Sequence, residues 1–359
     1  MNVLILTPSL TQHDAVSNEV VLQHKLLSAK GLGVSLYAEK VKSFSHGALC
    51  TRGKAVALLQ DPACLVIYHH STGWQEGEIL LAQVQGKLVI RYHGITPAEF
   101  FPHEPATQRE IQQGNEQTRR LAEHHRLQLV ICNSHFIQQE WPSGGMGKYP
   151  VEVLAPFHSL EAFPSLAFQK IEDEIHVLFV GRFTPHKGQS NLLRLMIRYR
   201  ERYGSLFHLH LVGKGSGKKT FLYALYQEIF ANSLSAHVHI HYDVEAKILA
   251  SLYQRSHFFI SFSEHEGFGL PLLEAQYHGL AVLALYRGAV KEALGAAALG
   301  GETLDLDRFC AAIRILSTHQ KMREEVVQAG HKNFEIYKMK RLQEKFLALL
   351  GVNDDNARQ

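Results

Sequence analysis

Short runs of aliphatic, β-branched and aromatic residues recur along the whole chain, separated by longer stretches in which apolar and polar positions are mixed. The runs have the length of buried strands, and the stretches between them are long enough for helices. This alternation is typical of an α/β fold, in which helices cover both faces of parallel sheets. We predict strands at residues 3–6, 34–37, 65–68, 88–92, 129–132 and 151–154, and a second series at 176–180, 207–212, 237–241, 258–262 and 281–285.

The two series predict two doubly wound, Rossmann-like domains, because 359 residues are too many for one ordinary core. The predicted connection contains Pro164 and an acidic end. We therefore assign residues 1–169 to the first domain and 170–337 to the second, and we predict a C-terminal helix in 338–359. Ligands of such folds bind at the carboxyl ends of the strands, so we expect a site in the cleft between the domains.

Composition narrows the class of protein. Hydrophobic residues make up 46% of the chain and charged residues 20%, which excludes a disordered or fibrous protein. The formal charge of +3 is too small to indicate nucleic acid as the partner. The cysteines are few and form no Cys-x-x-Cys pair, and no segment is typical of a signal peptide or a membrane-spanning helix. We expect a cytoplasmic protein, with peripheral contact to the inner face of the membrane left open.

The segment 261–275 carries the strongest chemical signal. A predicted strand enters a loop with two glycines, and Pro271 stands where the first turn of a helix is expected. The free N–H groups and the positive dipole end of that helix form a site suited to phosphate. Glu266 and Glu274 flank the same site, and carboxylates are suited to hydroxyl groups rather than to phosphate. The segment therefore predicts a phosphate bound by backbone and a sugar bound by carboxylates.

A pair of cations follows another predicted strand. Arg182 and Lys187 come directly after the strand 176–180, which opens the second domain. One fork-shaped and one point-like cation can neutralise a diphosphate whose charge grows as a bond to it breaks. We expect both side chains to face the ligand.

Histidines follow two predicted strands of the first domain. His93 comes after the strand 88–92, and His69 and His70 follow the strand 65–68. A lone histidine is more often structural, but a place after a strand favours a functional role for His93. His69 and His70 are expected to shape the cleft or the acceptor site.

Glu266, seven intervening residues and Glu274, with Gly-Phe-Gly-Leu-Pro between them, resemble the signature of retaining glycosyltransferases of family 4. That family has the GT-B fold, two Rossmann-like domains facing across a cleft. The resemblance implies that Glu266 lies near the donor sugar, that Glu274 binds the ribose of the nucleotide, and that Arg182 and Lys187 hold the diphosphate without a metal. It also implies that sugar and phosphate are bound by the backbone of Gly267, Phe268, Gly269 and Leu270.

The resemblance reaches the rest of the chain. The segment 92–97 is similar to a Tyr-His-x-Ile-Thr-Pro stretch of a subset of the family, which implies that His93 lies beside donor sugar and acceptor. In this architecture the C-terminal helix crosses back to the first domain. The loop after the first strand lacks the glycines of many members. By position, the remaining donor-binding candidates are Asp14, Ala15, Tyr242 and Val244.

Two patterns are set aside. The segment 213–220 suggests a phosphate-binding loop, but Lys218 lacks the following Ser or Thr. The chain has 23 histidines, and His237, His239 and His241 alternate, so they are expected on one face of a strand. No carboxylate or cysteine stands at ligand spacing near them, and we expect neither a metal nor another cofactor.

Together these features predict a retaining, metal-independent hexosyltransferase that uses a GDP- or UDP-linked sugar. The expected acceptor is a saccharide or a lipid-linked saccharide in the synthesis of cell-surface polysaccharide or lipopolysaccharide. Two alternatives remain open. A nucleotide-sugar epimerase of the same fold would need no acceptor, and a non-catalytic partner subunit would bind nucleotide without turnover.

Overall fold

The computed structural model describes residues 1–12, 14–42, 48–142, 147–162, 174–215 and 219–352. Its contacts form two compact units, Met1–His158 with Met339–Gln359, and Ser159–Lys338. The predicted boundary between 169 and 170 lies outside the described residues, whereas the contacts divide the chain already at Ser159.

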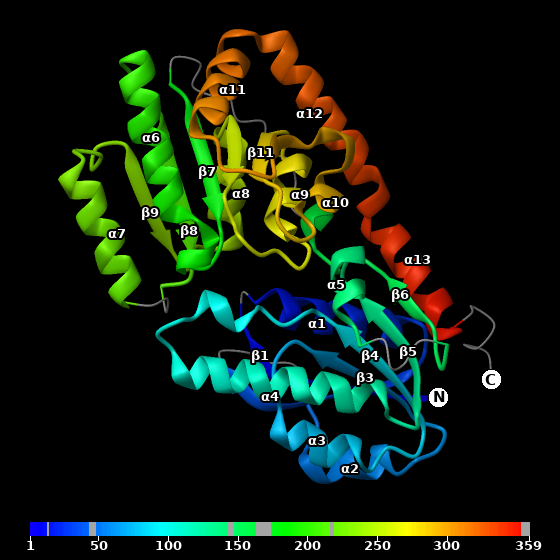
Figure 1. Ribbon diagram of the computed structural model, residues 1–359. Coiled ribbons are helices and arrows are strands. Elements are labelled where there is room, and N and C mark those ends of the chain that lie inside the picture. Colours follow the sequence, from blue (N-terminus) through cyan, green and yellow to red (C-terminus); the bar gives the residue numbers. More distant parts are fainter. Residues whose placement is uncertain (13, 43–47, 143–146, 163–173, 216–218, 353–359) are drawn as a thin grey trace. The chain divides into compact units, whose positions relative to one another are not determined.

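The first unit is built on a six-stranded parallel sheet of order β2-β1-β3-β4-β5-β6 (Figure 1). Its strands are β1 Asn2–Thr11, β2 Gly33–Lys42, β3 Leu65–His70, β4 Lys87–Tyr92, β5 Leu127–Cys132 and β6 Val151–Val153. Its helices are α1 Ala15–Ala29, α2 Arg52–Leu59, α3 Gln75–Leu81, η1 Ala98–Phe100, α4 Pro105–Ala122, α5 His135–Glu140 and α13 Met339–Leu350.

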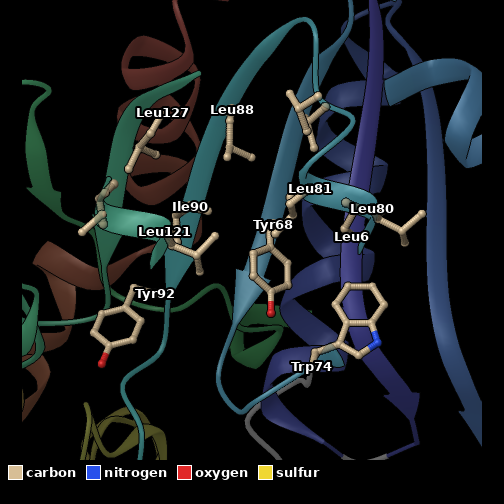
Figure 2. Close-up of a cluster of buried hydrophobic side chains, with 14 of the residues drawn as sticks. Leu6, Tyr68, Trp74, Leu80, Leu81, Leu88, Ile90, Tyr92, Leu121 and Leu127 are labelled. Atoms are coloured by element: carbon tan, nitrogen blue, oxygen red, sulfur yellow. The ribbon is translucent and has the colours of Figure 1, made fainter. Parts of the chain in front are cut away.

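Alternation along the strands gives this sheet two buried faces. One face packs in a core that includes Tyr68, Tyr92, Trp74 and leucines of α3 and α4 (Figure 2). The other face points residues of β3 and β4 toward α1, and there the apolar pattern is interrupted by His69 and Arg91. The helix α13 is held to this unit through Phe346, whose ring meets Phe157 edge to face at 5.3 Å.

The second unit repeats the architecture with a parallel sheet of order β12-β11-β10-β7-β8-β9 (Figure 1). Its strands are β7 His176–Val180, β8 His208–Gly213, β9 Val238–Tyr242, β10 Phe258–Ser261, β11 Ala281–Leu285 and β12 Leu299–Gly301. Its helices are η3 Leu160–Ala162, η4 Pro185–Lys187, α6 Gln189–Tyr203, α7 Lys219–Ala231, α8 Ala246–Arg255, α9 Leu270–Tyr277, α10 Val290–Leu294, η5 Gly295–Ala297, α11 Leu306–Thr318, α12 Gln320–Phe334 and η6 Glu335–Tyr337.

The predicted strands are confirmed, with ends that differ by a few residues. The sequence did not predict β12, because Leu-Gly-Gly lacks the apolar run that marks a strand. No helix of the described residues is long and apolar enough to cross a membrane.

Six histidines lie together on one face of β7, β8 and β9, and we call this group the histidine ladder: His176, His208, His210, His237, His239 and His241. Adjacent rings stack with centroids between 4.9 and 5.5 Å apart. Their nitrogens pair at 3.0 to 3.2 Å in two rows, one running from His241 through His210 to His176 and the other from His239 to His208. At the end of each row the Nε2 atom lies 3.4 or 3.5 Å from Glu174 Oε2.

The paired nitrogens explain how so many histidines share one surface. In each pair one nitrogen donates a proton and the other accepts it, so neutral rings satisfy one another and two facing imidazolium rings cannot. Among the described residues no group of His, Cys, Asp or Glu side chains is arranged to hold a metal ion. Burial, together with the neighbouring histidines, lowers the pKa of His210 to about 3, and burial also lowers the pKa values of His176, His239 and His241.

Acid is therefore expected to destabilise the second unit. In the unfolded chain His176, His210, His239 and His241 have pKa values near 6.5, so below that pH the unfolded state binds protons that these four rings do not bind in the folded state. Stability is fully present above pH 7 and is lost as the pH falls through 6.5 toward the lowered folded values. The melting temperature should fall by about 5 °C or more between pH 7.5 and 5.5. In His210→Gln the fall should be smaller, while the control His103→Gln, at an exposed residue outside the ladder, should keep the wild-type fall.

Candidate functional site

The order of strands in the second unit reverses between β7 and β10, the two strands at the centre of its sheet. At such a reversal the following loops turn to opposite sides and leave room for a ligand at the carboxyl ends of the strands. Arg182 and Lys187 follow β7, and the loop with Glu266 follows β10. The topology thus brings together the two segments that the sequence singled out separately.

Lys187 and Glu266 form an ion pair at this point. Lys187 Nζ lies 2.6 Å from Glu266 Oε1 and donates a second hydrogen bond to the carbonyl oxygen of His265 at 3.2 Å. Their side chains are only 12% and 18% exposed, so the pair is well shielded from solvent. Burial alone would raise the pKa of Glu266, but the Lys187 ammonium and hydrogen bonds from Lys187 and Ser263 outweigh it and lower that pKa. Glu266 is therefore an ionised hydrogen-bond acceptor at neutral pH.

The turn after β11 holds the backbone of Glu266 in place. Ala289 N donates to the carbonyl oxygen of Glu266 at 2.9 Å, and Gly288, with φ of +59°, passes so close that a Cβ atom there would collide with the same oxygen. Glu264 instead directs its carboxylate toward Arg287, at 3.5 Å. The two neighbouring glutamates therefore have separate surroundings.

The loop after Glu266 leads into α9 as predicted. Gly269 precedes the helix with φ of +89°, a conformation that favours glycine, and Pro271 stands in the first turn. The ring of Phe268 is buried against Tyr337, at a centroid distance of 5.4 Å. Phe268 thus anchors the loop by its side chain, and Leu270 is the first residue of the helix. Pro271 has no N–H and Leu272 N donates to the carbonyl oxygen of Gly269 at 2.9 Å, so the feature of this turn that suits an anion is the positive end of the helix dipole.

Glu274 is held by a residue that the sequence did not single out. Tyr253 of α8 donates its hydroxyl to Glu274 Oε2 at 2.6 Å. Burial raises the pKa of Glu274, and the tyrosine hydrogen bond opposes that rise. One carboxylate oxygen is thereby oriented from inside the unit. No local pattern marks Tyr253, because its role depends on the packing of α8 against α9.

Arg182 and Gly188 shape the loop after β7. The side chain of Arg182 is exposed, and its carbonyl oxygen accepts a hydrogen bond from Gln189 Nε2 at 2.7 Å. Gly188 has φ of +76° and lies against the end of β10, where a Cβ atom would collide with the carbonyl oxygen of Phe262. This close approach brings Lys187 within reach of Glu266.

The loop after β9 contains the two remaining candidates of this unit. Tyr242 is 37% exposed, and its hydroxyl shares a hydrogen bond with that of Tyr226 at 2.9 Å. Asp243 has φ of +46°, and its carboxylate accepts a hydrogen bond from Gly215 N at 2.9 Å. The loops after β8 and β9 therefore support each other, with Val244 half-buried beside them.

In the first unit the strand order reverses between β1 and β3, and the histidine candidates lie at the ends of β3 and β4. His93 and His69 share a hydrogen bond between Nε2 and Nδ1 at 3.0 Å. His70 points to the opposite face, where its nitrogens lie 3.2 Å from Tyr68 Oη and 2.8 Å from Thr118 Oγ1. The side chain of His70 is fully buried and packs α4 onto the sheet, and its expected role in shaping the cleft or the acceptor site stays a prediction.

Asp14 and Ala15 lie where β1 enters α1. Asp14 is the N-cap of that helix, and its Oδ2 accepts hydrogen bonds from the N and Oγ atoms of Ser17 at 3.0 and 2.9 Å. A capping role therefore accounts for its carboxylate. Ala15 is the first residue of α1 and is exposed.

Comparison with known proteins found a family similarity in the second unit. Residues 165–333 match the family model described as glycosyl transferases, group 1. The second unit is therefore similar to glycosyl transferases of group 1. A search of curated proteins found no match.

Solved structures match the whole chain. They include sucrose-phosphate synthase from Thermosynechococcus elongatus, with 15% identity and a TM-score of 0.76 over 98% of each chain. They also include HepE from Anabaena in complex with UDP and glucose, with 17% identity and a TM-score of 0.75 over 98% of this chain and 100% of that one. A third is WaaG, a glycosyltransferase involved in lipopolysaccharide biosynthesis, with 13% identity and a TM-score of 0.69 over 98% and 99%. The fold is GT-B, as predicted.

The close approach at Gly188 predicts a difference between two glycine variants of the second unit. Gly188 and Gly204 both have positive φ, but only Gly188 has backbone within reach of an added Cβ atom. Alanine at either site should cost about 1–2 kcal/mol of strain, and Gly188→Ala should cost more because Phe262 must also move. Thermal unfolding of both variants checks this. Equal losses would contradict the close approach of Gly188 to β10.

Proposed function

We propose that this chain is a retaining, metal-independent glycosyltransferase that transfers a hexose from a nucleoside diphosphate sugar to a hydroxyl of a saccharide or lipid-linked saccharide. The observation that carries the proposal is the shielded Lys187–Glu266 pair at the strand reversal of the second unit, which is similar to group 1 glycosyl transferases. A cation and an ionised carboxylate held at one point can serve both halves of such a donor, the diphosphate and the sugar hydroxyls.

In the proposed reaction the bond between C1 of the sugar and the oxygen of the distal phosphate breaks. The acceptor oxygen forms the new bond to C1 on the same face, and its proton passes to the leaving phosphate, so no oxidant or metal is needed. Negative charge grows on the diphosphate, and Lys187, Arg182 and the positive end of the α9 dipole would stabilise it. Glu266 would hold the sugar hydroxyls, and its ion pair keeps Lys187 oriented before the donor binds.

The other candidates have roles consistent with their surroundings. Glu274, with one oxygen held by Tyr253, would bind the ribose hydroxyls through the other. Tyr242 and Val244 would lie beside the base, and the backbone of Gly267, Phe268, Gly269 and Leu270 beside sugar and phosphate. In the first unit, His93 and the start of α1 at Asp14 and Ala15 are the candidates for contact with the donor. His69 would act through His93.

For substrate and setting, the names of two similar structures support the proposal without deciding it. HepE is described in complex with UDP and glucose, and WaaG is described as acting in lipopolysaccharide biosynthesis. We propose a UDP- or GDP-linked hexose as donor and cell-surface polysaccharide or lipopolysaccharide synthesis as the setting. A cytoplasmic enzyme with peripheral contact to the membrane would have access to both kinds of substrate.

Loss of either member of the ion pair should nearly abolish transfer. Glu266→Gln and Lys187→Met should each lower kcat about 100-fold or more, because each leaves a buried charge unpaired and removes a contact to the donor. The matched control is Glu264→Gln, two residues away and directed at Arg287, which should retain most activity. Release of nucleoside diphosphate from UDP- and GDP-sugars, with and without mixed saccharide acceptors, is the measurement.

Three outcomes would contradict the proposal or favour one of the alternatives. Full activity of both variants would remove the assigned roles. Conversion of the donor sugar to its epimer without any acceptor would identify an epimerase. Stabilisation by UDP or GDP in a thermal-shift screen without hydrolysis or transfer would identify a binding subunit, because a ligand of the folded state raises the melting temperature whether or not turnover occurs.

A further inference from the structure

A buried chain of hydrogen bonds connects His93 to the interior of the first unit. His93 Nε2 pairs with His69 Nδ1 at 3.0 Å, and His69 Nε2 pairs with Gln23 Oε1 at 3.0 Å. Gln23 Nε2 then donates to Glu19 Oε1 at 3.0 Å. Arg91 Nε donates to the same oxygen at 2.8 Å and closes the chain. The last four side chains of this chain, from His69 to Arg91, are at most 1% exposed.

The direction of every proton in this chain follows from Arg91, which can only donate. Because Glu19 Oε1 accepts from Arg91, the atom of Gln23 that faces it must be the amide nitrogen, and the amide oxygen of Gln23 must face His69. His69 therefore carries its proton on Nε2. Its Nδ1 is then an acceptor, so the proton between the two rings belongs to His93 Nε2.

The second nitrogen of His93 is also occupied. Asn133 Nδ2 lies 3.3 Å from His93 Nδ1 and can donate to it when that nitrogen carries no proton. The Glu19 carboxylate could instead favour a proton on His93 Nδ1. Its Oε2 atom, however, lies 3.9 Å from that nitrogen, which is beyond hydrogen-bonding distance. Burial, helped by the nearby His69 and Arg91, lowers the pKa of His93 and opposes a charged ring.

We propose that Gln23 and His69 are positioning residues that hold His93 as the neutral tautomer with its proton on Nε2. Both ring nitrogens are then used inside the first unit, so His93 presents a fixed, uncharged surface and takes no part in proton transfer. This rests on the proposed function, in which the acceptor proton goes to the leaving phosphate. The buried Glu19–Arg91 pair sets the direction of the chain.

The tautomer can be measured without any assay of activity. In protein labelled with ¹⁵N in histidine, two-bond ¹H–¹⁵N spectra distinguish the two neutral tautomers and the charged ring, and comparison with His93→Gln assigns the signals of residue 93. We expect a protonated Nε2 and an unprotonated Nδ1 from pH 8 to pH 6. A proton on Nδ1, or a ring that becomes charged above pH 6, would overturn the proposal. Gln23→Met should mix the tautomers, and the control Gln117→Met, also buried but bonded to Trp74, should leave them unchanged.

Activity tests the positioning role separately. In His69→Asn the amide oxygen can take the place of Nδ1 and accept from His93 Nε2, whereas in His69→Leu it cannot. We expect kcat in the leucine variant to fall about tenfold, or ~1.4 kcal/mol, with the KM for donor changed less than about twofold, and the asparagine variant to recover most of kcat. Equal losses in the two variants would show that His69 acts only by packing. If wild-type protein transfers no sugar while the tautomer is as predicted, the proposed function fails and the assignment of the ring proton stands.

Discussion

The reversal of strand order within the sheet is the constraint on which the candidate site of the second unit depends. The helix that follows a parallel strand can pack on either face of the sheet. Where the helices after two neighbouring strands pack on opposite faces, a crevice is left at the carboxyl ends of those strands. In the second unit this occurs between β7 and β10. Lys187 and Glu266 meet there although 78 residues lie between them in the chain, because their strands are adjacent and the Gly188 turn lies against the end of β10.

Polar groups brought into a buried sheet need partners, and the two units meet this need differently. In the second unit a shielded ammonium and carboxylate neutralise each other, which keeps the pKa of Glu266 low despite burial. In the first unit the ion pair joins the buried side chains of Glu19 and Arg91. Only neutral side chains extend from this pair toward His93. The first arrangement suits the proposed diphosphate site, and the second suits the proposed neutral form of His93.

Much of the fold could be predicted from sequence because each strand is a local signal. Runs such as 281–285 and first-turn prolines such as Pro271 are visible without tertiary information, and so is the Glu266 to Glu274 spacing. What could not be predicted depends on contacts between elements. Tyr253 reaches Glu274 only because α8 packs beside α9. Arg91 stands inside an apolar strand, which was a visible signal, but its partner Glu19 is 72 residues away on α1. The contacts of His70 depend on which face of β3 its side chain occupies, and alternation along the strand puts it on the face opposite His69.

The histidine surplus shows why composition alone misleads about chemistry. An alternating strand of histidines suggests metal ligands, yet ligands must converge on one point, and in the ladder the nitrogens of neighbouring rings pair with each other instead. The rings stack and share protons through these pairs, so the hydrogen bonds of the ladder are complete only when the rings are neutral. The ladder spans the sheet from Glu174 beside β7 to His241, which stands one residue before the carboxyl end of β9.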